Sequence, residues 1–300
     1  MSARGRCGGI PVAGPDGSAH VPVMPAEVGG FFRETPSGGL IVDGTAGGGG
    51  HVEVLLEACP GVRILGIERD PDAAAALAGR FSQEGRVTVR NASYVSIPEL
   101  LTELGAGPAS GALFDLGLSS LQLDDASRGF AHSADGPLDM RYDRTTGATA
   151  ADLVNRLSKK DLADLFYRYG EEGRSRRIAD AVVEARPIRT TAQLAAAVGG
   201  SVRGNPVKIL SRVFQALRIA VNSELDHLGR LLDGLGAWTE TGARVAFLTF
   251  HSLEDRAVKT FLRESPDFGP TTPPWSVPGP AELRANPRSR SARLRTGVRL

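Results

Sequence analysis

Three acidic residues in this chain each stand directly after a short apolar segment with the composition of a buried strand. They are Asp43, Glu68 and Asp115. In a doubly wound sheet, ligands bind beyond the carboxyl ends of the strands, so three such carboxylates are expected to face one site. A single acid of this kind can equally be an N-cap or a turn residue, but three at successive strand ends favour a ligand site.

A glycine-rich turn follows the first acid. Residues 44–51 read GTAGGGGH, and an apolar-periodic segment begins at Val52. Strand, glycine turn and helix together form the opening of a nucleotide-binding βαβ unit. Glycines let the backbone approach a ligand that a Cβ would block, and a helix N-terminus attracts a carboxylate or phosphate. We therefore predict a cofactor site here, with Glu68 placed to accept hydrogen bonds from ribose hydroxyls.

The turn does not by itself identify the nucleotide. No lysine follows the glycines as in a P-loop, and the spacing departs from G-x-G-x-x-G. NAD, FAD and S-adenosylmethionine all remain open on these grounds. The surrounding acids favour a ligand with a cationic centre, such as a sulfonium.

The third acid leads into a small polar loop, which runs from Asp115 through Ser119 and Ser120. The carboxylate could accept N–H bonds from a reacting amine and so orient the nitrogen lone pair toward an electrophile. Taken alone, the loop is slightly better explained as an Asx or Ser cap. Farther on, His251 and Ser252 are adjacent and no nucleophile elbow precedes them, so we reject a Ser-His-Asp triad. The five histidines lack metal-ligand spacing, and we expect no metal.

The elements that position these residues alternate between strand and helix. Strands are predicted at 40–43, 63–68, 86–90 and 111–115, with helices at 25–32, after the glycine turn, after Asp70-Pro71 and at 97–104. This alternation predicts an α/β fold with a doubly wound, mostly parallel sheet.

From residue 122 to 208 the patterns are helical only, which predicts an inserted all-helical domain. The cofactor-binding domain would then comprise residues 20–121 and 209–300, and resume with a long helix at 211–235, a strand at 244–250 and a helix at 253–262. Residues 1–19 are rich in glycine and proline and are expected to be disordered. Residues 281–300 carry six arginines and one acid, as a solvated end or a phosphate-binding strip would.

The composition is that of an ordinary globular protein. Of 300 residues, 41% are hydrophobic and 23% are charged. The net charge is +1, so the overall charge does not indicate that the protein binds nucleic acid. No apolar run reaches the roughly 20 residues of a membrane span, and the N-terminus lacks a signal-peptide core. Cys7 and Cys59 are too few for a disulfide framework or a zinc site, which favours the cytoplasm.

Nine strings, in order, resemble one family: the bacterial ribosomal RNA small-subunit methyltransferase H family of S-adenosylmethionine-dependent cytosine-N4 methyltransferases. The strings are HVPVM (20–24), DGTAGGGGH (43–51), GIERDP (66–71), DLGLSSLQLDDASRGF (115–130), DGPLDMR (135–141), YGEE (169–172), FQALRIAVNSEL (214–225), FHSLEDRAVK (250–259) and NPRSRSARLR (286–295). They cover the chain from His20 to Arg295.

The resemblance implies a Rossmann-like methyltransferase with a helical insertion that recognises substrate. It also implies S-adenosyl-L-methionine as cofactor, with contacts at Asp43, Gly47, Gly49, Gly50, His51, Glu68, Tyr94, Asp115 and Gln122. The family usually has Asp in place of Glu68 and Phe in place of Tyr94, and each replacement keeps the required chemistry. Residues 208–212 depart from the string that many relatives carry.

The implied reaction is methyl transfer to the N4 amine of a decoding-centre cytosine in 16S rRNA. Asp115, Ser119 and Ser120 would hold that amine, and the base must leave its stack to reach them. Candidate RNA contacts are Arg128, Phe130, Arg141, His251, Arg288, Arg290 and Arg293. The implied partner is the small ribosomal subunit. The sequence leaves open a homodimer, naked RNA or assembled subunit as substrate, and two rivals: an NAD(P)-dependent oxidoreductase and a non-catalytic ribosome-binding module.

Overall fold

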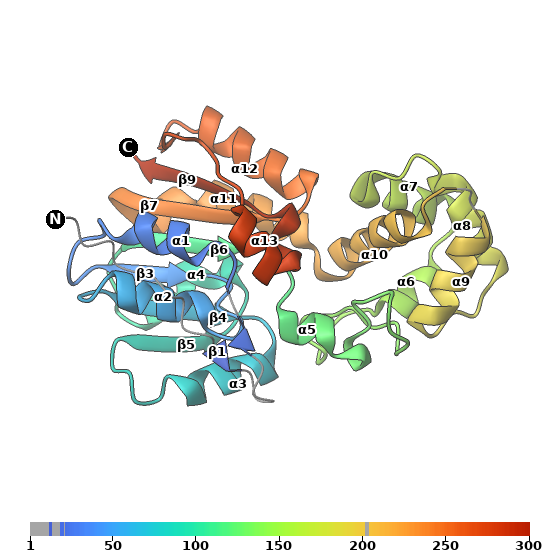
Figure 1. The fold of residues 1–300 in the computed structure, drawn as a ribbon, viewed down its shortest axis with the longest axis horizontal. Coiled ribbons are helices and arrows are strands. Elements are labelled where there is room, and N and C mark those ends of the chain that lie inside the picture. Colours follow the sequence, from blue (N-terminus) through green and yellow to red (C-terminus); the bar gives the residue numbers. More distant parts are fainter. Residues whose placement is uncertain (1–11, 14–18, 21, 202–203) are drawn as a thin grey trace. The chain divides into compact units, whose positions relative to one another are not determined.

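The structure is a computed structural model that describes residues 12–13, 19–20, 22–201 and 204–300 (Figure 1). The chain forms two compact units. The first runs to Gly117 and resumes at His227, and the second is Leu118–Asp226. Of the segment 1–19 expected to be disordered, residues 1–11 and 14–18 lie outside the described residues. Strand β1 (Val12–Ala13) pairs antiparallel with β2 (Ala19–His20).

The first unit is built on a seven-stranded sheet with the order β5-β4-β3-β6-β7-β9-β8 (Figure 1). The strands are β3 (Leu40–Asp43), β4 (Arg63–Glu68), β5 (Val87–Asn91), β6 (Ala109–Asp115), β7 (Thr239–Thr249), β8 (Phe268–Pro270) and β9 (Arg293–Arg299). Strands β3 to β7 pair in parallel, whereas β9 pairs antiparallel with both β7 and β8. The predicted α/β fold with a mostly parallel sheet is confirmed.

Alternate residues of each buried strand enter opposite hydrophobic cores, as the period of a strand requires. Ile41 packs on one face and Val42 on the other, and Leu113 and Phe114 divide in the same way. Helices cover both faces of the sheet. Helices α1 (Pro25–Phe32), α2 (Gly50–Ala58) and α3 (Pro71–Arg80) pack in one of the two cores, and α4 (Ile97–Glu103), α11 (Glu224–Trp238) and α12 (Ser252–Glu264) pack in the other. The unit also contains the short helix α13 (Pro280–Ala285) and the 3-10 turns η1 (Tyr94–Ser96) and η3 (Pro287–Ser291).

The second unit consists of helices and loops around a core of its own. Its helices are α5 (Ser120–Asp124), α6 (Ala150–Arg156), α7 (Lys159–Gly170), α8 (Ser175–Glu184), α9 (Thr191–Ser201) and α10 (Pro206–Asn222), with the 3-10 turn η2 (Ala126–Arg128). The unit is longer than the range 122–208 expected from the sequence. The difference arises because α10 packs within it, with Val213 and Leu217 in the same core as Phe166.

Two sequence expectations need correction. The long helix expected at 211–235 is two helices, because Ser223 adopts a left-handed φ of 53° and its N–H caps α10 on the Ile219 carbonyl. The basic segment near the C-terminus is not simply a solvated end, since residues 293–299 form strand β9 between β7 and β8. In the described part of the chain, no helix has the length and hydropathy to cross a bilayer.

Candidate active site

The glycine turn between β3 and α2 adopts a conformation that only glycine tolerates well. Gly47 and Gly49 have φ of 52° and 84°. A Cβ on Gly49 would lie 2.6 Å from Phe81 Cε2, so packing also requires glycine there. A Cβ on Gly48 would meet no atom within 4 Å, so the turn borders open space at that point. Gly49 is the N-cap of α2 and provides no side-chain capping bond, which leaves N–H groups of the first turn of the helix available to a ligand.

Glu68, at the end of β4, ties this turn to the sheet. Its Oε2 accepts the N–H of Gly47 at 3.0 Å, and its Oε1 accepts the N–H of Asp70 at 2.8 Å. The side chain is buried, and burial raises the pKa of Glu68 to about 7. Two carboxylate oxygens offer about four acceptor positions, so Glu68 can hold the turn and still accept hydrogen bonds from a ligand.

Asp43 carries a buried oxygen with no hydrogen-bond partner in the described part of the chain. Its Oδ1 accepts the N–H of Thr45 at 3.1 Å, while its Oδ2 has no hydrogen bond among the described residues. Burial raises the pKa of Asp43 to about 6, against the lowering effect of nearby His51. An unpaired buried acceptor costs about 1–3 kcal/mol, so a ligand that donates to Oδ2 or carries positive charge would be stabilised here.

Asp115, at the end of β6, is held from two sides. Its N–H donates to Thr45 Oγ1 at 2.6 Å, and its Oδ2 lies 3.6 Å from His51 Nδ1. The other ring nitrogen of His51, Nε2, lies 2.9 Å from the Val23 carbonyl oxygen. Because a carbonyl only accepts, Nε2 carries the hydrogen and Nδ1 faces Asp115. The Asp115 side chain remains 24% exposed, so its carboxylate is oriented and still accessible.

Tyr94 provides a flat aromatic ring beside the glycine turn. It opens η1 after β5, and its ring packs edge-on against Phe114 at 5.9 Å and His227 at 6.3 Å. A Cβ on Gly44 would lie 3.3 Å from the Tyr94 Cβ, which shows how close the two segments are. Sequence reasoning did not foresee His227, which approaches from α11.

The sheet register explains why these residues meet. Asp43 pairs with Gly66 on β4 and Leu113 on β6, so β3, β4 and β6 end at the same edge. Within the first unit the structure thus brings together the predicted acids, the glycine turn, His51 and Tyr94. The set fits S-adenosylmethionine: an acceptor for ribose, an aromatic face for adenine, uncapped N–H groups for the carboxylate, and acids for the positive centres.

Two residues that position the site were missed from the sequence. Thr45 links Asp43 to Asp115 through its N–H and its hydroxyl. Asn91, at the end of β5, donates from Nδ2 to the carbonyl oxygens of Glu68 and Arg69 at 2.9 and 3.1 Å. The available signal was the same in both cases: a small polar residue at, or just beyond, a strand end.

The candidates in the second unit are largely engaged within it. Gln122 is buried, and its Oε1 accepts the N–H of Ser119 at 3.4 Å. Arg128 is buried and donates to the carbonyl oxygens of Arg141 and Tyr142 at 2.9 and 2.8 Å. The side chain of Ser120 lies outside the described residues.

Phe130 and Arg141 also have internal partners. Phe130 is buried, and its ring stacks on that of Tyr142 at 5.7 Å. Arg141 forms a two-point pair with Asp139, at 2.8 and 3.0 Å. Together with Arg128, these residues stabilise the loop from 128 to 142, a role that the sequence analysis did not assign to them.

The remaining RNA candidates lie in the first unit. His251 is the N-cap of α12 and forms a capping box with Glu254, with 8% of its side chain exposed. Arg288 and Arg290 are exposed on η3. Arg293 is exposed at the start of β9, pairs with Asp255 at 3.0 Å and lies 5.3 Å from the Trp275 ring. Only the three arginines present substantial surface.

Comparisons with known proteins agree on one family. The model of the MraW methylase family matches residues 17–299. Three proteins called ribosomal RNA small subunit methyltransferase H are close relatives. That of Sorangium cellulosum is 45% identical over 95% of this chain and 92% of its own length. Those of Methylobacterium sp. and Synechococcus elongatus are each 43% identical, over 94% and 95% of this chain and 91% and 96% of their own lengths.

Among solved structures, an rRNA methylase from Streptococcus thermophilus has a TM-score of 0.41 and 10% identity over 94% of this chain and 99% of that one. The family match and the curated relatives extend over nearly all of the described chain. This chain therefore belongs to the MraW methylase family and is an S-adenosylmethionine-dependent methyltransferase.

Proposed function

We propose that this protein methylates small-subunit ribosomal RNA at the N4 amine of a cytosine, cytosine 1402 in the usual numbering. The relatives' names support the rRNA of the small subunit as substrate. The observation that carries the amine assignment is Asp115: an oriented, accessible carboxylate one strand away from the glycine turn. The reaction would then take place in the cytoplasm, on RNA that is free or already assembled.

When bound, S-adenosylmethionine supplies a methyl group on a positively charged sulfur. The exocyclic amine of cytosine is a poor nucleophile because its lone pair is delocalised into the ring. Asp115 would accept an N–H of this amine, which favours a pyramidal nitrogen whose lone pair points at the methyl carbon. The amine nitrogen would form a bond to the methyl carbon as the C–S bond breaks, its proton would pass toward Asp115, and the neutral thioether product would leave.

The proposed RNA contacts are the exposed arginines Arg288, Arg290 and Arg293. We leave out Arg128 and Phe130, which are buried and serve loop contacts, and His251, whose side chain is 8% exposed and caps α12. Neutralising Arg288 and Arg290 should weaken RNA binding and lower its salt dependence, with cofactor affinity unchanged.

The test is Asp115→Asn, assayed with labelled S-adenosylmethionine and small subunits that lack the modification. Loss of an amine acceptor should lower turnover at saturating S-adenosylmethionine by about 100-fold or more. The matched control is Asp233→Asn, since Asp233 is an exposed acid on α11. Full turnover of Asp115→Asn, with normal cofactor binding, would contradict the assignment.

Analysis of the product separates the alternatives. N4-methylcytidine in the digested rRNA supports the proposal, while a methyl group on another nucleoside or on protein assigns a different amine. An oxidoreductase would bind reduced nicotinamide and take up no methyl label. A non-catalytic ribosome-binding module would bind the subunit and leave it unlabelled.

A further inference from the structure

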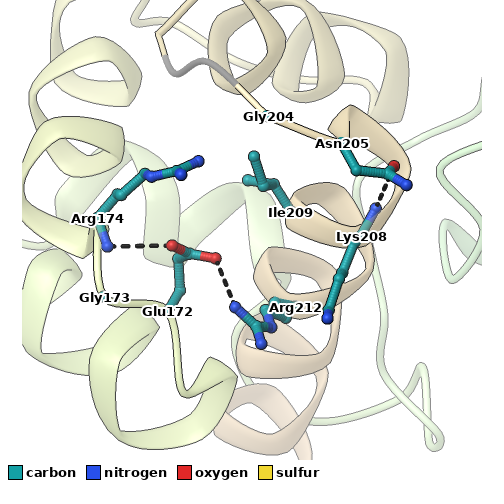
Figure 2. Close-up of a pocket in the computed structure, with 8 residues that line it drawn as sticks. All are labelled: Glu172, Gly173, Arg174, Gly204, Asn205, Lys208, Ile209 and Arg212. Carbon is teal, nitrogen blue, oxygen red and sulfur yellow. Dashed lines mark hydrogen bonds and ion pairs between the residues drawn. The ribbon is translucent and has the colours of Figure 1, made fainter.

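A pocket of about 260 Å³ lies within the second unit, between the α7–α8 connection and the start of α10 (Figure 2). Two of its lining residues, Glu172 and Ile209, are buried and form its floor. The others lie at its rim, where Gly173, Gly204 and Asn205 are exposed. The pocket is therefore open along one side, and it is larger than a single phosphate group requires.

Three cationic side chains surround this pocket: Arg174, Lys208 and Arg212. Figure 2 shows Arg174 on the α7–α8 side and Lys208 and Arg212 on α10. Among the described residues that line the pocket, Glu172 is the one acid. Its Oε2 accepts from Arg212 Nη1 at 3.2 Å, and its Oε1 accepts the N–H of Arg174 at 3.0 Å. The described lining of the pocket therefore holds three cationic side chains and one acidic side chain.

Two helices begin at this pocket, and both have cationic residues and no acid in their first turn. Arg174 is the N-cap of α8, with no side-chain capping bond, and Arg176 and Arg177 follow in its first turn. Asn205 caps α10, whose first turn contains Lys208 and no acid. Cations are unfavourable at a helix N-terminus, where the macrodipole is already positive. A bound anion would offset both the dipoles and the side-chain charges.

We infer that this pocket binds a phosphodiester group of the single-stranded RNA that flanks the target base. The inference rests on the proposed RNA substrate and names a contact that serves it. The positive charge selects a phosphate, and the exposed rim lets a continuous chain pass across the pocket. Arginine and lysine with helix N–H groups are the donors that nucleic-acid backbones bind. Such a contact would set the register of the RNA without reading its sequence.

The first test uses Lys208→Gln, because Lys208 is exposed and its loss should leave the fold intact. Binding of a short fluorescent single-stranded RNA is measured by anisotropy over a range of salt concentrations. We expect the dissociation constant to rise about three- to tenfold, and the slope of log affinity against log salt to fall by about 0.7. The control is Lys160→Gln, which removes the same charge from the exposed start of α7, far along that helix from the pocket. Equal effects of the two variants would overturn the inference.

A second variant, Gly204→Ala, alters the pocket without changing its charge. Its Cβ would lie 2.8 Å from Arg174 Nη1, on a residue with φ of 140°, and should displace that guanidinium. Reduced RNA affinity of Gly204→Ala would support the inference, and unaltered affinity would overturn it.

Two more measurements separate the source of the phosphate from the proposed function. The bound fluorescent RNA is challenged, at constant ionic strength, with inorganic phosphate, with a nucleoside monophosphate and with unlabelled RNA. At equal phosphate concentration, the unlabelled RNA should displace the labelled RNA and the two small phosphates should not. If free phosphate binds tightly and depends on Lys208, the phosphodiester assignment is wrong. Methyl transfer to small subunits tests the proposed function separately. If the wild-type protein methylates the subunits and Lys208→Gln neither slows this transfer nor weakens RNA binding, the pocket inference is wrong and the proposed function stands.

Discussion

Cofactor affinity should depend on pH through one buried carboxylate, Glu68. Burial raises its pKa to about 7 in the cofactor-free protein. If ribose hydroxyls donate to this group, the ionised form is the one that binds. At about pH 6 roughly ten of eleven molecules carry the proton, so the dissociation constant should be about tenfold higher than at pH 8 or above.

The same proton affects stability in the opposite direction. Since the folded pKa lies above the ordinary value of 4.5, the folded protein holds the proton more tightly than the unfolded chain. The resulting stabilisation is complete below about pH 4.5 and is lost as the pH rises through 7. It amounts to roughly 3 kcal/mol, at about 1.4 kcal/mol for each pKa unit. The raised pKa of Asp43 stabilises the folded protein in the same way, and this stabilisation is lost as the pH rises through about 6.

The assay is calorimetric titration with S-adenosylhomocysteine, the stable product, between about pH 6 and pH 8. Near pH 6, the wild-type protein should release a proton when it binds the ligand. The proton release is measured as a difference in the observed binding enthalpy between buffers of different ionisation enthalpy. Glu68→Gln should remove the pH dependence centred near pH 7, leaving the smaller contribution of Asp43 near pH 6, and should weaken binding about 10- to 100-fold, the value of a charge-assisted hydrogen bond. Glu57→Gln, on the exposed side of α2, is the control. A wild-type affinity that is constant over this range would refute the reasoning.

Two further predictions concern stability and are checked by thermal or urea unfolding. Gly49→Ala places a Cβ 2.6 Å from Phe81 Cε2 and should cost about 1–3 kcal/mol, whereas Gly48→Ala, which meets no atom within 4 Å, should cost much less. Equal losses would show that the turn has no packing requirement. Asp255→Ala should cost about 3–5 kcal/mol, because Arg295 is buried and loses bonds of 2.6 and 3.1 Å to this carboxylate. A loss as small as that of Asp233→Ala would contradict a structural role for the pair.

The sequence predicted those features that depend on local pattern. Short apolar runs that end on Asp43, Glu68 and Asp115 gave the parallel strands and the edge where the acids meet. The left-handed break at Ser223 was missed because no glycine or proline marks it and the helical periodicity continues through it. An L-residue in that conformation is set by the packing around it and not by its own type.

Contacts between segments that are far apart in the sequence were the other features that the sequence did not predict. Arg295 was counted with an exposed basic segment, but it is buried against Asp255, which is 40 residues away in the sequence. Phe130 was assigned to RNA as an aromatic in a polar string, but it packs in the core of the second unit. In retrospect, the alternation of arginine with Leu294 and Thr296 was a strand signal that the charge obscured.

The position of β9 has a consequence for the order in which this protein can acquire its fold during synthesis. Among the strands that the structure describes, β8 pairs with β9 alone, and one edge of β7 is likewise covered by β9. Both must therefore wait for residues 293–299 to leave the ribosome before their backbone groups are paired. Until then the nascent chain exposes the edge of β7, a surface prone to pairing with other chains. A ribosome stalled shortly before residue 293 would thus release an aggregation-prone product, although the glycine turn and all the acids of the site would already have been made.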